Sequence, residues 1–391
     1  MSPSLPFPSD PAAFTPIAGQ QPAGLAIPRL DLIREEHRAF RSEVGGGFWV
    51  LTRYEAIVAA LQDHELFSNA AVSVFDPEPR YRWIPEMLDP PEHTEWRRRL
   101  RPLFAPGRIA AMETHIRATC AALVRELAGR GECDFVPDFA RRFPTTIFLE
   151  LMGLPVERLE TFLAWEDAIL HAPPAPDRRE ARMAAMGEVS ACFAELIRER
   201  RAEPRDDLVS VAAGWDVPEE DLLALCLLLF LAGLDTVTAQ LSFAFWHLSE
   251  HPAERAALVA EPARIPAAVE EFVRAYSIVL PGRKLTRDAV VEGCPMRAGE
   301  MVLLPLTMAN RDPGAFPDAA EVVLDRAKNR HLGFGAGVHR CLGAHLARAE
   351  LRIALEEWHR VIPDYQVSGE VVEHVYQLLG LDHLPLRWAT G

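Results

Sequence analysis

The sequence lacks the features that would place the chain outside the cytosol. Its six cysteines include no Cys-x-x-Cys pair and no zinc-finger spacing, so we expect reduced thiols and no disulfide framework. The first 20 residues are proline-rich, without a charged start or an apolar run, and give no sign of a signal peptide. No break in composition divides the 391 residues. We therefore expect a cytoplasmic protein with a Pro-rich segment at residues 1–25 and a single domain at residues 26–391.

Positive charge is also scarce. The chain has 41 Lys and Arg against 56 Asp and Glu, a net charge of −15, which argues against nucleic acid or an anionic membrane as the main partner. One stretch, residues 222–248, carries a single formal charge at Asp235 over a length that would span a bilayer. Polar residues such as Thr236 and Gln240 interrupt its second half. We interpret it as a helix buried through the centre of the protein.

Local patterns predict the surrounding elements. A first helix is expected at residues 28–43, a strand at residues 48–51, and a second helix at residues 53–62 with Thr52 and Glu55 as its capping box. The central helix should begin at Pro218 and end at His251. Further helices are expected at residues 108–129, 139–152, 156–171 and 178–201, with breaks at Pro144 and Pro155 and a proline-rich hinge at residues 172–176.

Three glycines precede a cysteine in the stretch His331-Leu-Gly-Phe-Gly-Ala-Gly-Val-His-Arg-Cys-Leu-Gly343. Because a helical pattern follows Cys341, its thiol should lie at a helix N-terminus, where the dipole favours the thiolate and lowers the pKa. Such a thiolate is a soft metal ligand, and haem iron is the obvious candidate. Most lone cysteines are instead small buried residues. A dinucleotide-binding loop is a poorer alternative, because Val338 stands where the third glycine belongs.

The stretch from Phe334 to Gly343 resembles the haem-binding loop of cytochromes P450, in which a cysteine thiolate holds the haem iron. Three further motifs stand in the order of that family: Ala232-Gly-Leu-Asp235-Thr236, Glu271-Phe-Val-Arg274 and Asp325-Arg326. The chain is therefore similar to a bacterial cytochrome P450, nearest to the camphor-hydroxylase type. This resemblance implies a mainly α fold with small β sheets, haem b as the cofactor and Cys341 as its iron ligand.

The resemblance also implies roles for other residues. Asp235 and Thr236 would form an acid and alcohol pair that relays protons to oxygen, with Thr236 bonded back to the carbonyl of Ala232. A buried acid needs a partner, and we expect His171 to be that partner of Asp235. Taken alone, the pair would be an ordinary satisfied carboxylate and a back-bonded threonine. The other residues expected to contact the haem are His93, Arg97, Arg283, Phe334, Gly335, His339 and Gly343.

A long loop at residues 64–91 has no periodicity but many prolines and aromatic residues, which is typical of a functional segment. The resemblance further implies that Glu271 and Arg274 form a buried pair, joined by Arg326, that holds the segment before the haem loop, although a surface ion pair is the simpler alternative. The residues expected to line an apolar substrate pocket are Tyr81, Trp83, Ile84, Leu228, Leu231, Ala232, Val279, Leu280 and Leu378.

We therefore predict a monooxygenase that hydroxylates a compact, terpenoid-like hydrophobic substrate with O2. Electrons would come from a separate ferredoxin and its reductase, because no part of the chain resembles a reductase. Arginines at residues 97–99 and 326–352 would form the basic docking patch, unless internal ion pairs use them. A polyketide or steroid substrate anchored by Tyr81, a haem-thiolate sensor and a haem-free binding protein are the alternatives. We expect a monomer without a membrane or nucleic-acid partner.

Overall fold

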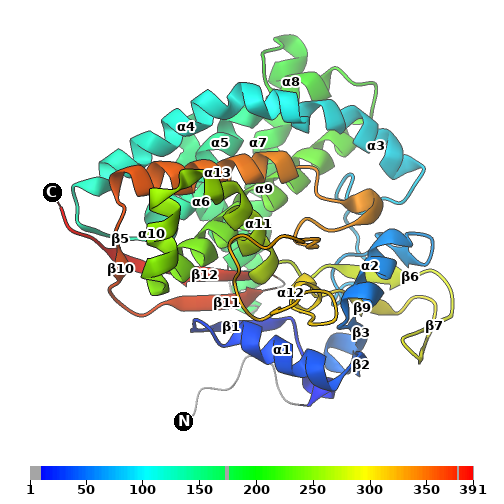
Figure 1. Cartoon of the computed structure of the whole chain (residues 1–391). Coiled ribbons are helices and arrows are strands. Elements are labelled where there is room, and N and C mark those ends of the chain that lie inside the picture. The colour runs from blue at the N-terminus through cyan, green and yellow to red at the C-terminus, as the bar shows by residue number, and fades with distance from the viewer. Residues whose placement is uncertain (1–9, 172–175, 377, 391) are drawn as a thin grey trace.

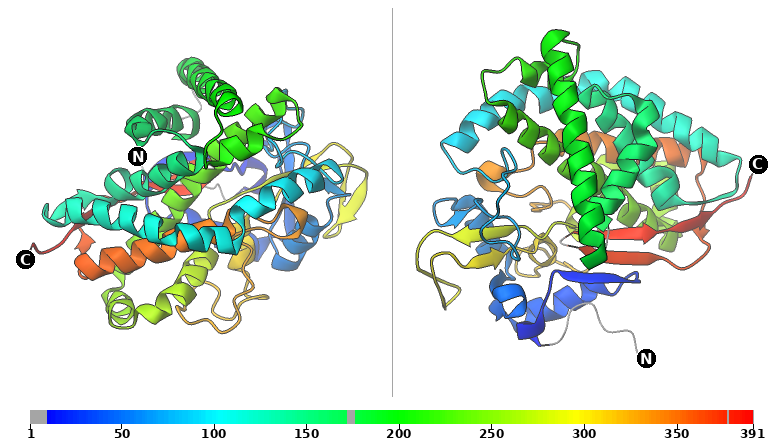
Figure 2. Two further views of the ribbon diagram at one scale, coloured as in Figure 1. Left: turned by 90° about the horizontal axis from the view of Figure 1, so that it is seen from above. Right: turned by 180° about the vertical axis from the view of Figure 1, so that it is seen from behind.

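One long helix, α9 (Glu219–Glu250), runs through the centre of the molecule, and the other elements surround it (Figure 1). The view from behind in Figure 2 shows this helix over its whole length. The computed structural model describes residues 10–171, 176–376 and 378–390, with the backbone alone for residues 176–179. The chain is mainly helical, and its short strands form small sheets at the periphery.

The remaining helices form most of the body around α9. They are α1 (Ala26–Glu36), α2 (Tyr54–Gln62), α3 (Glu92–Leu100), α4 (Pro106–Ala128), α5 (Arg142–Met152), α6 (Leu159–Glu166), α7 (Pro176–Ala202), α8 (Leu208–Ala213), α10 (Pro252–Ala260), α11 (Ile265–Ala275), α12 (Leu306–Asn310) and α13 (Ala344–Val361). Helix α13 lies along α4, as Figure 1 shows, and α13 also contacts the central helix.

The described strands form four small sheets, with the orders β1-β11-β12, β10-β13-β5, β2-β3-β9-β6-β4 and β7-β8. Their bounds are β1 (Ile17–Pro22), β2 (Ala39–Ser42), β3 (Phe48–Leu51), β4 (Phe67–Ser68), β5 (Glu132–Asp134), β6 (Gly282–Leu285), β7 (Ala289–Val291), β8 (Cys294–Met296), β9 (Met301–Leu303), β10 (Gln366–Val367), β11 (Val372–Tyr376), β12 (Leu379–His383) and β13 (Pro385–Arg387). Only the pairing of β3 with β9 is parallel among these described strands. Because β1 pairs with β11, residues 17–22 of the Pro-rich segment lie within the fold.

The central helix has the predicted ends. Pro218 precedes it in an extended conformation, and three acidic residues occupy its first turn, where the helix dipole favours negative charge. His251 leaves the helical conformation just before Pro252. Within the described residues α9 is the one helix long and apolar enough to span a membrane, a test that the core helix of a soluble protein also passes. Its side chains are largely buried by the surrounding elements, as predicted.

Aromatic side chains pack against both halves of α9. Phe245 stacks on Phe135 with ring centroids 4.2 Å apart and meets the fully buried Trp358 of α13 at 5.4 Å. Toward the other end, Phe230 contacts Phe162 of α6 at 5.8 Å. Burying one such side chain contributes about 1.5–3 kcal/mol. These contacts fix the position of the helix that carries the acid and alcohol pair.

Two predictions near the N-terminus were wrong. The first helix ends at Glu36 rather than at residue 43, because residues 39–42 pair with β3 as strand β2. Thr52 does not cap α2. Its hydroxyl donates instead to the carbonyl of Arg38 at 2.9 Å, and the helix begins at Tyr54 without a side-chain cap. The hydroxyl of Thr52 thus makes a tertiary hydrogen bond instead of the local capping bond that the motif predicts.

The middle helices also differ in their bounds. Pro144 lies inside the first turn of α5, where the missing N–H costs no hydrogen bond, so it does not break the helix. The π-helical turns Val136–Ala140 and Asp167–His171 replace regular helix before α5 and after α6. The predicted hinge falls at residues 172–175, which lie outside the described residues, and at Pro176, the first residue of α7.

Candidate functional site

The glycine-rich loop holds Cys341 on a tightly defined backbone. Gly337 has a φ of 69°, and a Cβ added there would lie 2.3 Å from the carbonyl oxygen of Leu61, so only glycine fits this position. The amide of Cys341 donates to the carbonyl of Phe334 at 2.8 Å. Gly343 is the N-cap of α13. The thiol therefore lies just before a helix N-terminus, as predicted.

The electrostatics of the thiol differ from the expectation. Cys341 is exposed, whereas Cys120, Cys133 and Cys192 are buried. The surrounding protein nevertheless desolvates its sulfur, and this burial raises the pKa of Cys341 despite a backbone hydrogen bond from Gly343 and nearby arginines that lower it. The predicted lowering of the pKa was wrong for the protein alone, because desolvation outweighs the helix terminus. A bound cation at the sulfur would reverse that balance.

An ion-pair group made of Glu271, Arg274 and Arg326 holds the segment before this loop, as predicted. Glu271 and Arg274 are fully buried, with a bidentate contact of 2.7 and 2.9 Å. Arg274 also donates to the carbonyls of Asn310, Ala319 and Glu321. Arg326 completes the group at 3.1 Å from both oxygens of Glu271. Every charge in the group thus has a partner of opposite sign. The group is buried, so the alternative of a surface ion pair does not apply.

A second group, the cationic group, consists of His93, Arg97, Arg283 and His339 and is not balanced in this way. The rings of His93 and His339 lie 4.0 Å apart. Both ring nitrogens of His93 and Nε2 of His339 are buried without a hydrogen-bond partner. Burial and neighbouring cations lower the pKa of His93 to about 4 and that of His339 to about 2. Such unpartnered buried ring nitrogens require an explanation.

The two arginines of the cationic group also lack ion pairs among the described residues. Arg97 donates to the carbonyl of Arg340 at 2.8 Å, and Arg283 donates to the carbonyl of Gly282 at 2.7 Å. Burial lowers the pKa of Arg283 to about 10, although Glu86 and Asp89 oppose this shift. Four positively charged or protonatable side chains from three parts of the chain therefore converge. This arrangement fits a bound anion with more than one negative charge.

The acid and alcohol of α9 lie as the sequence predicts. The hydroxyl of Thr236 donates to the carbonyl of Ala232 at 2.9 Å, and Asp235 is buried with its Oδ1 3.0 Å from Nε2 of His171. Burial acts against the charged forms, but each partner outweighs it. The pKa of His171 is held well above its usual value, and that of Asp235 is lowered.

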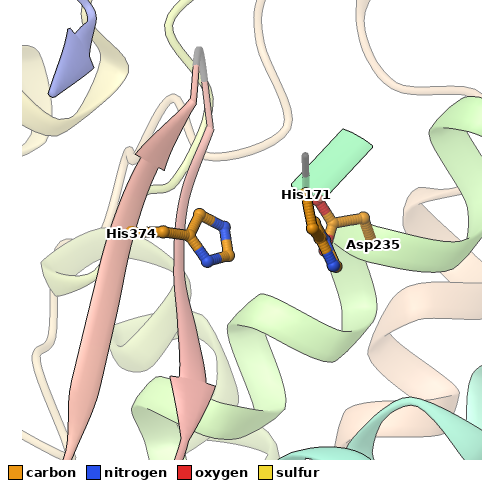
Figure 3. A group of neighbouring side chains, drawn as sticks. All are labelled: His171, Asp235 and His374. Carbon is orange, nitrogen blue, oxygen red and sulfur yellow. The ribbon is translucent and has the colours of Figure 1, made fainter. Parts of the chain in front are cut away.

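Sequence reasoning missed His374, which lies beside this pair. It comes from strand β11, and its ring centroid is 5.2 Å from that of His171. Figure 3 shows the three side chains, with the ring of His374 pointing toward the other two. No local motif marks His374, so nothing in the sequence could place it next to α9.

The predicted substrate residues occupy different environments. Tyr81 is 40% exposed and lies against Trp83 with ring centroids 4.9 Å apart. Val279 and Leu378 form an isolated bridge between two distant segments. Ile84, Leu228 and Leu280 are buried, Ala232 is exposed, and Leu231 is half-buried. Their roles remain predictions.

Comparison with known proteins identifies the family. The sequence profile described as cytochrome P450 matches residues 179–360. A probable cytochrome P450 127A1 from Sinorhizobium fredii is 37% identical over 355 residues, which cover 88% of this chain and 84% of the relative. The chain belongs to the cytochrome P450 family. The mycinamicin IV hydroxylase/epoxidase of Micromonospora griseorubida is 34% identical and covers 90% of this P450 and 88% of its own length.

Solved structures agree with this P450 assignment. The crystal structure of CYP101J2 matches with a TM-score of 0.88 and 28% identity, over 99% of this chain and 100% of the other. The bottromycin biosynthetic protein SalCYP matches with a TM-score of 0.83 and 36% identity, over 93% and 92%. The predicted family and the mainly α fold with small sheets are therefore confirmed. Cytochromes P450 bind haem b through a cysteine thiolate and act as monooxygenases, and this chain is a P450 monooxygenase.

The residues present fit that cofactor. Haem b carries two propionate carboxylates, and the cationic group offers four donors that lack an acidic partner at ion-pair distance within the described chain. The same loop that contributes His339 also presents the exposed Cys341. A thiolate ligand and a dianion-binding group thus occur together, as haem b requires.

Proposed function

We propose that this P450 hydroxylates a compact hydrophobic substrate, using O2 and electrons from a separate ferredoxin and its reductase. Cys341 is the iron ligand in this proposal, while His93, Arg97, Arg283 and His339 hold the propionates. Phe334, Gly335 and Gly343 would form the surface of the loop against the haem. The observation that carries the proposal is the cationic group with its orphaned donors beside the cysteine loop.

The haem would supply activation of O2, with the thiolate favouring O–O cleavage, and the protein would supply orientation and protons. Thr236 lies at the partly accessible surface of α9, with its hydroxyl oxygen free to accept a further hydrogen bond while it donates to Ala232. Asp235 is buried next to it and is held as a carboxylate by His171. We infer that Asp235 and Thr236 relay protons into the oxygen site.

The substrate class follows from the apolar pocket candidates. Trp83, Leu228, Leu231, Val279 and Leu378 offer carbon surface, and Tyr81 offers a hydroxyl near the same loop. Such lining favours a small apolar molecule of the terpenoid kind. A larger polyketide or steroid scaffold is the second candidate, because two relatives are named a mycinamicin IV hydroxylase/epoxidase and a vitamin D(3) 25-hydroxylase.

The electron donor would approach the surface near Cys341. Arg326, Arg348 and Arg352 form internal ion pairs, so the alternative that internal pairing uses part of the predicted docking patch holds for these three. Exposed basic residues that remain on the same segments are Lys328, Arg330 and Arg340, together with Arg98, which pairs with the exposed Glu95. These support docking of an acidic ferredoxin. We expect the enzyme to act as a cytoplasmic monomer.

The test is the carbon monoxide difference spectrum of reduced, haem-loaded protein. The far red-shifted Soret band of a thiolate-ligated carbonyl is expected for the parent and for Cys294→Ser, a cysteine that is half-buried in strand β8. Cys341→Ser should lose this band. A spectrum typical of histidine ligation in the parent, or an unchanged band in Cys341→Ser, contradicts the assignment. Substrate classes would then be compared through the haem spin shift that each compound produces.

A further inference from the structure

Three potential metal ligands converge at the inner side of α9. His171 ends the π-helical turn Asp167–His171, Asp235 lies on α9, and His374 lies on β11 (Figure 3). One ligand atom from each lies within 4.8 Å of the other two, and among the described residues this is the one group of at least three such side chains. Asp235 and His374 are buried and His171 is 14% exposed in its side chain. We call these residues the His–Asp–His cluster.

Both histidines of the cluster are oriented by carboxylates. Nδ1 of His374 lies 2.7 Å from Oδ1 of Asp382, which also accepts from Gln20 at 2.7 Å through its other oxygen. Nδ1 of His171 lies 3.2 Å from Oδ1 of Asp167. Each ring can therefore donate from Nδ1 to a carboxylate and bind a ligand through Nε2. His171 faces a second carboxylate, Asp235, at Nε2, and a metal ion would displace the proton of that nitrogen. Metal-binding histidines are held in this way, since the outer carboxylate fixes the tautomer and raises the basicity of the ring.

The backbone makes room for this arrangement. A Cβ added at Gly380 would lie 2.5 Å from Cε1 and 2.6 Å from Nε2 of His374. Because real side chains do not approach so closely, glycine at this position is what allows the ring to lie over strand β12. The ring is thus held from two sides, by Asp382 at Nδ1 and by the β12 backbone.

The local charge also favours a cation. Two neutral imidazoles and one carboxylate form a ligand set with a charge of −1. Glu166 is fully buried nearby, its charge interacts with that of Asp235, and its Oε1 has no hydrogen-bond partner. Arg141 is the cation that faces Glu166 and Asp167, at 2.9 and 2.8 Å. Burial raises the pKa of Glu166, but even without its charge the carboxylates of Asp167, Asp235 and Asp382 outnumber the cations Arg141 and His171 before an ion binds.

We propose that His171, Asp235 and His374 bind one Zn²⁺ ion, and that this ion inhibits the enzyme by occupying Asp235. Two imidazoles and a carboxylate leave an open position for water, as in three-ligand zinc sites. Ligand atoms on a tetrahedral Zn²⁺ with bonds of about 2.0–2.1 Å lie about 3.3 Å apart. His171 and Asp235 already have nearly that spacing, at 3.0 Å. His374 has to approach by up to about 1.5 Å.

The inhibitory part rests on the proposed function, whereas binding of the ion does not. An Asp235 carboxylate that is bonded to Zn²⁺ accepts and releases protons less readily, so the relay with Thr236 stops. The ion would also join the end of the π-helical turn, the central helix and the β11 strand. Zinc would therefore link the turn that follows α6 to the sheet that contains β11.

The first experiment measures zinc itself, with haem-loaded protein. Titration with ZnCl2 under calorimetry, followed by metal analysis after dialysis, is expected to give one tightly bound ion per chain. His374→Ala should weaken binding at least tenfold. The matched control is His383→Ala on β12, whose side chain is 56% exposed and pairs with Asp134 outside the cluster; it should bind zinc as the parent does. Equal binding by His374→Ala and His383→Ala overturns the site.

Zinc X-ray absorption identifies the ligands without interference from haem iron. Only nitrogen and oxygen neighbours at about 2.0–2.1 Å, with the outer scattering of two imidazoles, are expected. A sulfur neighbour at about 2.3 Å would mean that zinc sits on a cysteine, and overturns the proposal. The carbon monoxide spectrum of each variant shows whether it still folds and holds haem. If His374→Ala loses that spectrum, His374→Gln replaces it.

The second experiment tests inhibition separately. Saturating zinc should lower the rate at which the parent consumes reduced ferredoxin under air at least tenfold, whereas the rate of His374→Ala should stay at its own zinc-free value. Zinc bound at the cluster without any loss of rate overturns the inhibitory role and argues against proton relay by Asp235. Absence of zinc binding overturns the site alone, because the zinc-free enzyme still reports the proposed function.

Discussion

The ion-pair group and the cationic group are both buried near the cysteine loop, but only one of them is internally balanced. Glu271 meets Arg274 and Arg326 at 2.7–3.1 Å. The cationic group, in contrast, has orphaned ring nitrogens on His93 and an arginine, Arg283, whose one described hydrogen bond goes to its own chain neighbour. A balanced group stabilises the fold by itself. An unbalanced one has unsatisfied polar atoms that a ligand can satisfy, so the difference separates scaffold from site.

Breaking the balanced group should have the largest effect. Arg274→Met leaves Glu271 as a fully buried carboxylate with one cation fewer and frees three backbone carbonyls. We expect a loss of about 3–5 kcal/mol in the free energy of unfolding, measured by denaturant titration of the haem-free protein. Arg98→Ala, which removes the exposed pair with Glu95, is the control and should cost at most about 1 kcal/mol. Similar losses in both variants would show that the ion-pair group is not structural.

Removing a cation from the unbalanced group should not lower the free energy of unfolding of the haem-free protein. Arg283→Met removes a buried cation that has no ion pair, so haem-free stability should stay the same or increase. Haem affinity should fall about 10–150-fold, the equivalent of one charge-assisted hydrogen bond of about 1.5–3 kcal/mol. Haem transfer to a scavenging protein measures the second quantity. A haem-free Arg283→Met that is clearly less stable than the parent would assign Arg283 to the scaffold.

The sequence could predict the balanced group because its residues stand in short motifs. Glu271 and Arg274 are three residues apart on one helix, and Arg326 follows in a recognisable position. The back-bond of Thr236 and the pairing of Asp235 with His171 were also predicted, and both are confirmed. The contacts of Glu271 with Arg274 and of Thr236 with Ala232 are local. Arg326 lies 55 residues from Glu271 and was expected from the family resemblance, and His171 was expected because a buried acid needs a partner.

Other features depend on long-range contacts and could not be predicted. His374 reaches α9 from strand β11, and Gly380 makes room for its ring. That Arg283 has no carboxylate at ion-pair distance among the described residues is visible only when the chain is folded. The sequence predicts helix at residues 39–42, whereas this short segment is strand β2 through its pairing with β3. Desolvation, which raises the pKa of Cys341, likewise has no signature in the sequence.

Two hydroxyl side chains on α9, those of Thr236 and Ser242, differ in the same way between structural and functional positions. Thr236 and Ser242 both donate back to the helix, at 2.9 and 2.7 Å, but Ser242 is fully buried whereas Thr236 is partly accessible. If Thr236 relays protons, Thr236→Ala should release at least about ten times more peroxide per product formed, while the substrate spin shift is retained. Ser242→Ala should couple electrons to product as the parent does. Equal coupling in both variants would contradict the relay.

The titration of His93 should make the stability of the haem-free protein depend on pH. Burial, followed by the charge of Arg97, lowers the pKa of His93 from 6.5 to about 4 in the haem-free protein. Between these values the unfolded chain binds more protons than the folded one, so the free energy of unfolding falls as the pH falls from about 6.5 to about 4. His93→Asn should remove part of this slope, because asparagine does not titrate.

Bound haem should reduce the same slope in the parent, because a propionate near His93 would favour the protonated ring and raise its pKa. Denaturant titrations of haem-free and haem-loaded protein at several pH values measure the effect, with His115→Asn as the control. His115 is an exposed histidine that has its own carboxylate partner, Glu150. An identical pH slope in the parent and in His93→Asn would mean that His93 is not a buried neutral ring. The cationic group would then lose the property that distinguishes it from the ion-pair group.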